Sequence, residues 1–350
     1  MKINSFNIMA VMSKQARINR LENNFPKEFF YGLNYIPNFS IYDDIIDLEI
    51  DYKYYITEKI LNYKRYKFSK NKAEKIFSLL SKKKTLISFN DFDSFNLGYY
   101  NKNFNLICGF HRAYETIKKF NYDKRFETSL KKIKKIFFFG PKDKEEVENL
   151  FPFIKDKSKL FKFGVDTKFW INDRKNLNPN FDICCVGSDT FRDYEILKHL
   201  NKKLNIKLVT KLKINDLPKN IDYREGWLLK SKLTDTDIKE IYKDSKIVVV
   251  PLYQTTQPSG YSVTLQSMSL GKAVIIANIN GLWDRNLFKD GENIILYEPE
   301  NPKDLNKKIE LLINNKKLRT KIEKNAFETA RKFFSLSRMK NSLLEILENE

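Results

Sequence analysis

The sequence predicts an α/β protein of two Rossmann-like domains, each with a parallel sheet. The chain has 350 residues, of which 42% are hydrophobic, and this is enough for two cores. Apolar strand-like runs alternate with helical patterns in both halves. A polar stretch with a proline, at 172–180, separates the halves. We therefore expect one domain at 1–170, a second at 171–335, and a terminal helix at 336–350.

The first half alternates between the two kinds of pattern. Residues 1–12 are too short and too polar for a signal peptide or a membrane span, so they favour a first strand. No later segment has ~18 uninterrupted apolar residues, and we expect no membrane-spanning helix. Strands are expected at 84–90, 104–110 and 135–139, and helices at 71–81 and 113–120.

The second half has the clearer pattern. Its run at 247–251 is continuously apolar, which is typical of a strand buried on both faces of a parallel sheet. A helix at 234–243 has Thr234 or Asp235 as its cap. The remaining strands are expected at 182–186, 206–210, 273–277 and 293–297, and the remaining helices at 191–204, 303–314, 317–333 and 335–348.

The segment that follows the strand at 247–251 is the most informative. Pro258, Ser259, Gly260 and Ser262 place little side-chain bulk at the start of a helix, where exposed backbone N–H groups can meet an anion. The helix ends at Gly271, which supplies a left-handed cap. A loop of this kind at the carboxyl end of a parallel strand predicts a phosphate site.

The run PSGYSVTLQSMSLGKAVIIANINGLWD, at 258–284, resembles the donor-binding segment of GT-B glycosyltransferases, in particular the retaining family four. That family has two glutamates eight positions apart, where this chain has Pro258 and Gln266. The resemblance implies a nucleotide-sugar site that includes Tyr261, with Gln266 at the ribose, since an amide can accept and donate. It also implies that the two domains face each other across a cleft and that the terminal helix crosses back to the first domain. Residues 161–170 resemble the family's interdomain signature, with Trp170 in place of phenylalanine.

The resemblance also implies a cation for the leaving diphosphate. The family has a glycine followed four or five residues later by a lysine, and here Gly187 is followed by Arg192. Ser188 stands where an arginine is common, and Lys211 is a candidate substitute. Leu228 lies in a loop, at 227–230, that matches the one contacting the base. The alternative for Arg192 is an ordinary surface position in the first turn of a helix.

His111 ends the strand at 104–110, and two explanations stay open for it. The resemblance implies a catalytic contact near the transferred sugar, while a helix-capping role explains the residue equally well. Asp91 and Asp93 could hold a divalent metal against a diphosphate, as in GT-A enzymes. We expect no metal, because their segment lies in an ordinary βαβ pattern, and no cofactor beyond the nucleotide sugar. Three cysteines in apolar runs are expected to be buried thiols: Cys108, Cys184 and Cys185.

The net charge is +20, with +13 in residues 1–164 and +7 in residues 165–350. Such a surface attracts nucleic acid, anionic lipid or an anionic acceptor, although lysine-rich solvated faces often bind nothing. We expect no nucleic-acid partner, because the chain has no zinc, helix-turn-helix or aromatic RNA-binding motif. A membrane-facing basic helix or a solvated charge run would explain one cluster: Lys124, Arg125, Lys131, Lys132, Lys134 and Lys135.

Together these features predict a glycosyltransferase that moves a sugar from a nucleotide-diphosphate sugar to a glycan, a lipid-linked molecule or a small acceptor. The expected reaction is metal-independent and retains anomeric configuration, with a role in polysaccharide biosynthesis. The expected location is the cytoplasm, with peripheral binding to the cytoplasmic face of an anionic membrane as an option. The alternatives are a non-catalytic nucleotide-sugar binding protein and a basic nucleic-acid-binding protein.

Overall fold

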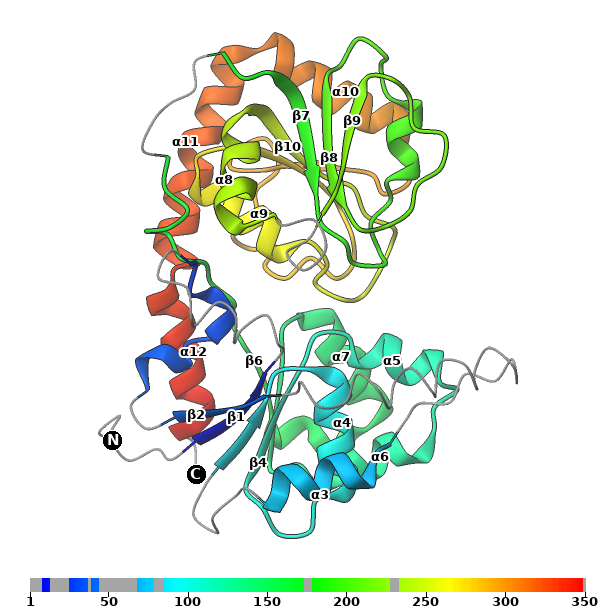
Figure 1. The fold of residues 1–350 in the computed structure, drawn as a ribbon, viewed down its shortest axis with the longest axis vertical. Coiled ribbons are helices and arrows are strands. Elements are labelled where there is room, and N and C mark those ends of the chain that lie inside the picture. Colours follow the sequence, from blue (N-terminus) through cyan, green and yellow to red (C-terminus); the bar gives the residue numbers. More distant parts are fainter. Residues whose placement is uncertain are drawn as a thin grey trace. The chain divides into compact units, whose positions relative to one another are not determined.

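The computed structural model describes residues 8–12, 25–36, 39–43, 68–78, 85–172, 178–226 and 233–348 (Figure 1). The chain divides into two compact units. Unit 1 comprises Met1–Asn23, Phe29–Lys162 and Lys340–Glu350, and unit 2 comprises Asn24–Glu28 and Phe163–Met339. The sequence placed the divisions after residues 170 and 335. It gave no indication that residues 24–28 join the second unit.

Unit 1 contains a six-stranded sheet in which all neighbouring strands are parallel. Its order is β2 (Phe39–Asp43), β1 (Ile8–Met12), β3 (Thr85–Ser88), β4 (Leu106–Phe110), β5 (Lys135–Phe138) and β6 (Ser158–Leu160). The predicted strands at 84–90, 104–110 and 135–139 are confirmed as β3, β4 and β5. All five residues of β4 are buried, as expected for a strand covered on both faces.

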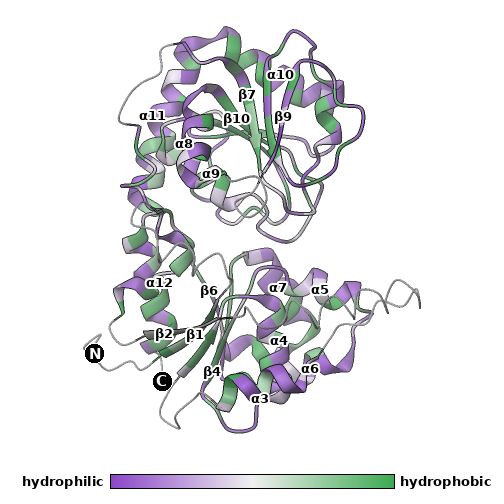
Figure 2. Cartoon of the chain, viewed as in Figure 1, coloured by the Kyte–Doolittle hydropathy of each residue, from purple (hydrophilic) through white to green (hydrophobic). Residues whose placement is uncertain are grey.

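The helices of unit 1 are α3 (Lys70–Ser78), α4 (Asp91–Tyr100), α5 (Ala113–Lys119), α6 (Lys124–Lys132) and α7 (Pro141–Leu150). Helix α4 packs against α3, α6 and β4, and α5 packs against α7. A cluster of fully buried aromatic rings fills the core between these elements and the sheet, and includes Phe95, Phe110, Phe126 and Phe138. Figure 2 shows the strands of this sheet as largely hydrophobic and the helices as mixed.

Unit 2 also contains a six-stranded parallel sheet. Its order is β12 (Ile295–Tyr297), β11 (Ala273–Ala277), β10 (Ser245–Val250), β7 (Phe181–Val186), β8 (Ile206–Thr210) and β9 (Ile221–Glu225). The chain builds outward from β7 on one side and from β10 on the other, so the strand order reverses between these two strands. Ligands of open α/β sheets bind outside the carboxyl ends of the strands at such a reversal.

The helices of unit 2 are α8 (Asp235–Lys243), α9 (Tyr261–Ser269), α10 (Pro302–Asn314), α11 (Lys316–Phe333) and the start of α12 (Leu336–Glu348). Thr234 caps α8 in a capping box with Asp237, which confirms one of the two predicted caps. Helix α9 packs against α11 and β11. Gly271 follows α9 with φ +69°, the left-handed conformation predicted for it.

The predicted helix at 191–204 is wrong. Arg192 forms an antiparallel bridge with Leu252, and Tyr253 N donates to Phe191 O at 2.9 Å. Only a short 3₁₀ helix, Glu195–His199, follows. The apolar spacing of this segment resembled a helix, but its backbone hydrogen-bonds the chain after β10 instead. Arg192 is therefore held in extended backbone and is not in the first turn of a helix.

Candidate functional site

Two glycines frame Arg192 at the strand reversal of unit 2. Gly187 follows β7 with φ +134°, and a β-carbon there would lie 2.6 Å from Nη2 of Arg192. Gly260 precedes α9 with φ +81°, and a β-carbon there would lie 2.6 Å from Cγ1 of Val250 and 3.6 Å from Nη1 of Arg192. Since no side chain fits at either position, the guanidinium lies against bare backbone on both sides.

Asp189 joins the two loops through its carboxylate. Oδ2 accepts from Nε of Arg192 at 2.8 Å, and Oδ1 accepts from Oγ of Ser259 at 2.6 Å. The Arg192 side chain is 3% exposed, whereas that of Asp189 is 36% exposed. The ion pair is therefore buried on the arginine side and open to solvent on the aspartate side.

The electrostatics of this pair keep both groups charged. Burial is the largest influence on the pKa of Arg192 and acts to lower it, but the charge of Asp189, the neighbouring Tyr194 and Tyr242 and the hydrogen bond to Asp189 together raise the pKa. Burial is also the largest influence on the pKa of Asp189 and acts to raise it, but the charge of Arg192 and the hydrogen bonds from Ser259, Arg192 and the Phe191 N–H together lower the pKa. A buried cation thus persists beside the loop that precedes α9.

Part of this cation has no acceptor within the described part of the chain. Nη1 of Arg192 is buried and makes no hydrogen bond there. The N-cap of α9 is Gly260, and no side chain caps this helix. A buried guanidinium N–H and an uncapped helix N-terminus are both groups that an anion satisfies. The geometry at this end of the sheet therefore fits a phosphate group.

The other predicted residues of the phosphate loop lie around this centre. Pro258 and Ser259 are buried, and Tyr261 and Ser262 open α9 with partly exposed side chains. The Tyr261 ring packs edge-on against Phe163, with ring centroids 4.4 Å apart. These residues, with Gly187, Arg192 and Gly260, form one locality at the ends of β7 and β10.

Ser188 and Lys211 lie together at the ends of neighbouring strands. Oγ of Ser188 accepts from the backbone N–H of Lys211 at 3.0 Å, and the Lys211 side chain is exposed. The serine thus fixes the loop after β8 next to the loop after β7. Leu228, the predicted base contact, lies outside the described residues.

Gln266 lies on α9 with its side chain buried and its amide engaged by protein groups. Nε2 donates to Oε1 of Glu28 at 3.1 Å, and Oη of Tyr242 donates to Oε1 of Gln266 at 3.5 Å. Gln266 is 1% exposed and Glu28 is fully buried. The predicted ribose contact of Gln266 stays a prediction.

Sequence reasoning missed two residues of this region. Asp189 stands three positions before Arg192, a spacing typical of a local ion pair, but its bond to Ser259 crosses 70 positions. Glu28 lies in the run PKEFFYGLNYI at 26–36, which is distinctive in composition. Its partner Gln266 is 238 positions away, and no local pattern could have linked them.

His111 belongs to unit 1, unlike the other predicted site residues. It follows β4, and its ring stacks on Phe139 with centroids 3.7 Å apart. Nε2 lies 2.9 Å from the carbonyl oxygen of Phe89. Burial lowers the pKa of His111, so the ring is neutral at neutral pH. A carbonyl can only accept, so Nε2 carries the proton and Nδ1 is an acceptor.

Asp91 and Asp93 both have protein partners. Asp91 accepts from the backbone N–H groups of His111 and Arg112, at 3.2 and 2.9 Å. Asp93 pairs with Lys72 at 2.9 Å, and both side chains are buried. Within the described ranges, no three histidine, cysteine or acidic residues are grouped as metal ligands would be. The three cysteines are buried free thiols, as predicted.

Members of the basic cluster on and after α6 make bonds within unit 1. Arg125 pairs with Asp123, Lys131 pairs with Glu127, and Lys132 donates to the carbonyl of Tyr99. Lys135 donates to the last carbonyls of α12, those of Ile346 and Leu347. Lys124 and Lys134 are exposed. Of the helices in the described ranges, none combines the length and apolar character needed to cross a bilayer.

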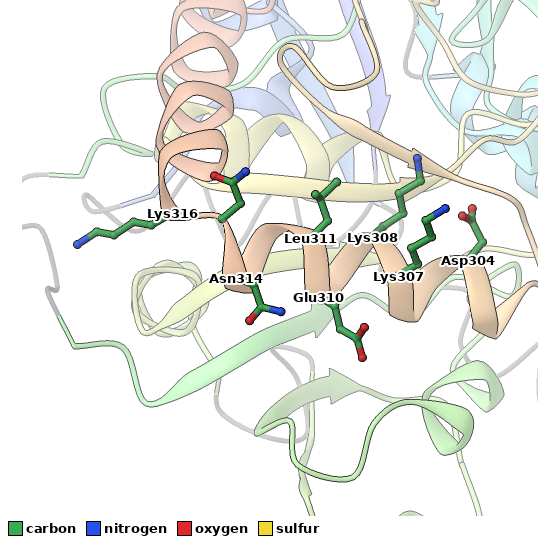
Figure 3. A pocket seen from close by; sticks show the side chains of 8 residues that line it. Asp304, Lys307, Lys308, Glu310, Leu311, Asn314 and Lys316 are labelled. Carbon is green, nitrogen blue, oxygen red and sulfur yellow. The ribbon is translucent and has the colours of Figure 1, made fainter.

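An open depression of about 580 Å³ runs along α10 of unit 2 (Figure 3). It is lined by Asp304, Lys307, Lys308, Glu310, Leu311, Asn314, Asn315 and Lys316. Figure 3 shows lysine, amide and carboxylate side chains spread along one helix and its end. None of the predicted site residues lines this depression, so we do not connect it with the site around Arg192.

The sequence of unit 2 matches a known family. Residues 173–329 match the family described as glycosyl transferases group 1. An uncharacterized glycosyltransferase of Methanocaldococcus jannaschii is 33% identical over 98 residues, which are 28% of this chain and 26% of that protein. An N,N'-diacetylbacillosaminyl-diphospho-undecaprenol alpha-1,3-N-acetylgalactosaminyltransferase of Campylobacter jejuni is 27% identical over 138 residues, or 39% and 35% of the two chains. These matches span about a quarter to a third of each relative's length.

The whole chain is similar to solved glycosyltransferase structures. HepE of Anabaena in complex with UDP-glucose superposes with a TM-score of 0.71 at 13% identity, over 98% of this chain and 100% of that one. A glycosyltransferase of Rickettsia africae superposes with a TM-score of 0.66 at 18% identity, over 99% and 100%. The fold is therefore GT-B, as predicted, with two parallel-sheet α/β domains.

Proposed function

We propose that the protein is a glycosyltransferase that uses a nucleotide-diphosphate sugar, because residues 173–329 match the glycosyl transferases group 1 family and the fold is GT-B. Unit 2 would bind this donor and unit 1 the acceptor. One observation carries the donor site: the buried Nη1 of Arg192 has no partner in the described ranges and lies beside the uncapped start of α9. The diphosphate of the nucleotide sugar has oxygens that can accept hydrogen bonds from both groups.

The same groups give a mechanism for loss of the nucleotide. When the bond from the anomeric carbon to the diphosphate breaks, negative charge grows on the departing phosphate oxygens. Arg192 and the first-turn N–H groups of α9, near Gly260, Tyr261 and Ser262, are fixed in place and stabilise that charge. Since these groups are positive before the donor arrives, the proposed reaction needs no metal ion. The backbone of Lys211 is held next to Ser188, and its exposed ammonium group is the proposed second positive charge.

We propose that His111 contacts the transferred sugar. Its Nδ1 is an acceptor in the neutral ring and suits a sugar hydroxyl, while Nε2 holds the ring to Phe89. Retention of anomeric configuration is proposed from the family resemblance alone. The ribose role of Gln266 and the base contact near Leu228 are proposed on the same ground.

The acceptor is proposed to be a glycan or a lipid-linked molecule. The name of the Campylobacter jejuni relative includes a diphospho-undecaprenol substrate, which supports the lipid-linked option. The net charge of +20 supports peripheral contact with an anionic membrane on its cytoplasmic face. Lys124, Lys131, Lys132 and Lys134 of the basic cluster have exposed side chains that such a contact would use.

Nucleotide binding and sugar transfer test the proposal together. We would titrate the protein with UDP, GDP, ADP and CMP and follow transfer from the matching sugar nucleotides. Arg192→Ala should weaken binding of the preferred nucleotide diphosphate by about tenfold or more, the size of a lost charge-assisted hydrogen bond. Arg331→Ala, at an exposed arginine of α11, is the matched control. Binding without any transfer would favour a non-catalytic sensor, and no binding would contradict the site.

A further inference from the structure

Glu28 is a buried carboxylate that receives three hydrogen bonds from two separate parts of unit 2, the segment 166–170 and α9. Nε1 of Trp170 donates to Oε1 at 2.7 Å, and Nε2 of Gln266 donates to the same oxygen at 3.1 Å. The backbone N–H of Asp166 donates to Oε2 at 3.1 Å. Glu28 and Trp170 are fully buried, and Gln266 is 1% exposed. This is a built polar network and not a surface contact.

The network requires a side chain at residue 28 that accepts hydrogen bonds and donates none. Three N–H donors converge on two oxygens, and an ionised carboxylate has enough lone pairs for all of them. A glutamine there would turn its NH₂ group toward either Trp170 or Asp166, both of which are donors. One buried donor would then lose its partner, which is costly in a dry site.

The same network explains why residue 266 is a glutamine. The family that this segment resembles has a glutamate at this position. A carboxylate at 266 would lie about 3 Å from that of Glu28, and two buried like charges at that distance cannot both stay ionised. With glutamine, the NH₂ group faces Glu28 and the carbonyl oxygen faces the Tyr242 hydroxyl. The departure at Gln266 and the buried Glu28 therefore belong together.

We infer that Glu28 is a positioning residue of the donor site, which fixes the Gln266 amide and, through it, the placement of α9. Gln266 is on the same helix whose N-terminus, at Gly260, lies beside Arg192. Trp170 and Asp166 anchor the other side of Glu28. The inference rests on the proposed function, because it assigns Glu28 to a nucleotide-sugar site.

The protonation state of Glu28 should matter to this arrangement. Burial raises its pKa to about 7, although the bonds from Trp170 and Gln266 act to lower it. If Glu28 were protonated, its O–H would point at N–H donors and would lack an acceptor. The Gln266 amide would have to turn its oxygen toward Glu28 to accept from this O–H. The other titratable groups at the network are Tyr242, bonded to Gln266, and Asp166, whose carboxylate accepts from the N–H groups of Lys27, Lys168 and Phe169.

The experiment uses the full-length protein and a sugar nucleotide as probe: UDP-glucose, GDP-mannose or ADP-glucose, whichever the wild type binds most tightly. These molecules lack the phosphate monoester group that titrates near pH 6, so their own charge stays constant. Affinity is measured from about pH 5.5 to about pH 8.5 for the wild type, Glu28→Gln, Gln266→Glu and the double variant Glu28→Gln/Gln266→Glu. Thermal unfolding of all four proteins is recorded in parallel.

At about pH 8 we expect Glu28→Gln to weaken probe binding about fivefold to twentyfold and Gln266→Glu at least as much. The double variant should lose less affinity than the two single variants lose in sum, because an amide again faces a carboxylate in it. Wild-type affinity should fall as the pH drops through about 7, and this fall should be absent in Glu28→Gln. If Glu28→Gln does not fold, Glu28→Asp replaces it, since aspartate only accepts but is shorter, and its pH profile should shift.

The possible failures are distinguishable. If Arg192→Ala weakens binding but Glu28→Gln keeps the wild-type affinity and pH profile, the proposed function stands and the role of Glu28 is overturned. A wild type that binds none of the probes contradicts the proposed function, and the positioning role falls with it. Strictly additive changes in both affinity and unfolding temperature would show that Glu28 and Gln266 are not coupled, and would overturn the inference on their own.

Discussion

Asp189 and Arg192 form an ion pair of 2.8 Å in which the arginine is buried and the aspartate is partly exposed. The pair leaves Nη1 of Arg192 without a hydrogen bond in the described ranges. Asp189 thus orients the guanidinium from one side. Its negative charge also lies where it opposes the approach of a diphosphate. The two effects can be separated by removing the charge while the side-chain shape is kept.

Asp189→Asn should strengthen binding of the preferred nucleotide diphosphate by about twofold to tenfold at low ionic strength. The asparagine oxygen can still accept from Arg192, while the repulsion between carboxylate and diphosphate is lost. Added salt should reduce the gain. Titration calorimetry at two salt concentrations measures both. Asp222→Asn is the control, because Asp222 is also ion-paired, with Lys207 on β8. Weaker binding in Asp189→Asn would show that orientation dominates.

Gly260→Ala should destabilise unit 2 and abolish donor binding. The new β-carbon would lie 2.6 Å from Val250, and φ is +81°. Strain and overlap together should cost about 2–4 kcal/mol in the free energy of unfolding. Gly291→Ala is a matched control, since φ is +75° and nothing lies within 4 Å of the added carbon. It should cost only about 1 kcal/mol. Equal losses in urea denaturation would rule out the close approach at Gly260.

Asp143→Asn should flatten the pH dependence of stability. Asp143 is fully buried and accepts from the backbone N–H groups of Ala113 and Tyr114, at 3.0 and 2.8 Å. Burial, followed by the charge of Asp91, raises its pKa to about 8. The folded state therefore binds this proton more tightly than the unfolded state does. Stability should fall as the pH rises from about 4 to about 8 and change little above that.

The contribution of Asp143 should approach 1.4 kcal/mol per pH unit in the steep range. Chemical denaturation between about pH 5 and about pH 9 measures it in the wild type and the variant. Glu28 adds a slope of the same sign up to about pH 7, and it remains in Asp143→Asn. Asp156→Asn, at an exposed aspartate of unit 1, is the control. An unchanged slope in Asp143→Asn would contradict the assignment.

Local patterns were sufficient for most strands of both sheets, although not for β2, β6 and β9, and for the glycines on either side of α9. Strand β4 and residues 247–250 of β10 form apolar runs because both of their faces are covered, and this composition is visible in the sequence. The start of α9 at Gly260 and its end at Gly271 follow from the conformational freedom of glycine. These features depend on neighbours within a few residues.

Features that depend on distant partners could not be predicted. The segment after Gly187 has helical spacing, yet its backbone pairs with residues near Leu252 and forms no α-helix. The link from Asp189 to Ser259 and the network around Glu28 arise only when the chain is folded. In each case a long-range hydrogen bond overrides or completes what the local sequence indicates.

A crystal structure of the protein with UDP-glucose, or with whichever sugar nucleotide binds most tightly, tests the central claim most directly. The account predicts that diphosphate oxygens lie within hydrogen-bonding distance of Nη1 of Arg192 and of the first-turn N–H groups of α9. A nucleotide bound elsewhere, such as along α10 at Lys307 and Lys308, with Arg192 still bonded only to Asp189, would contradict it.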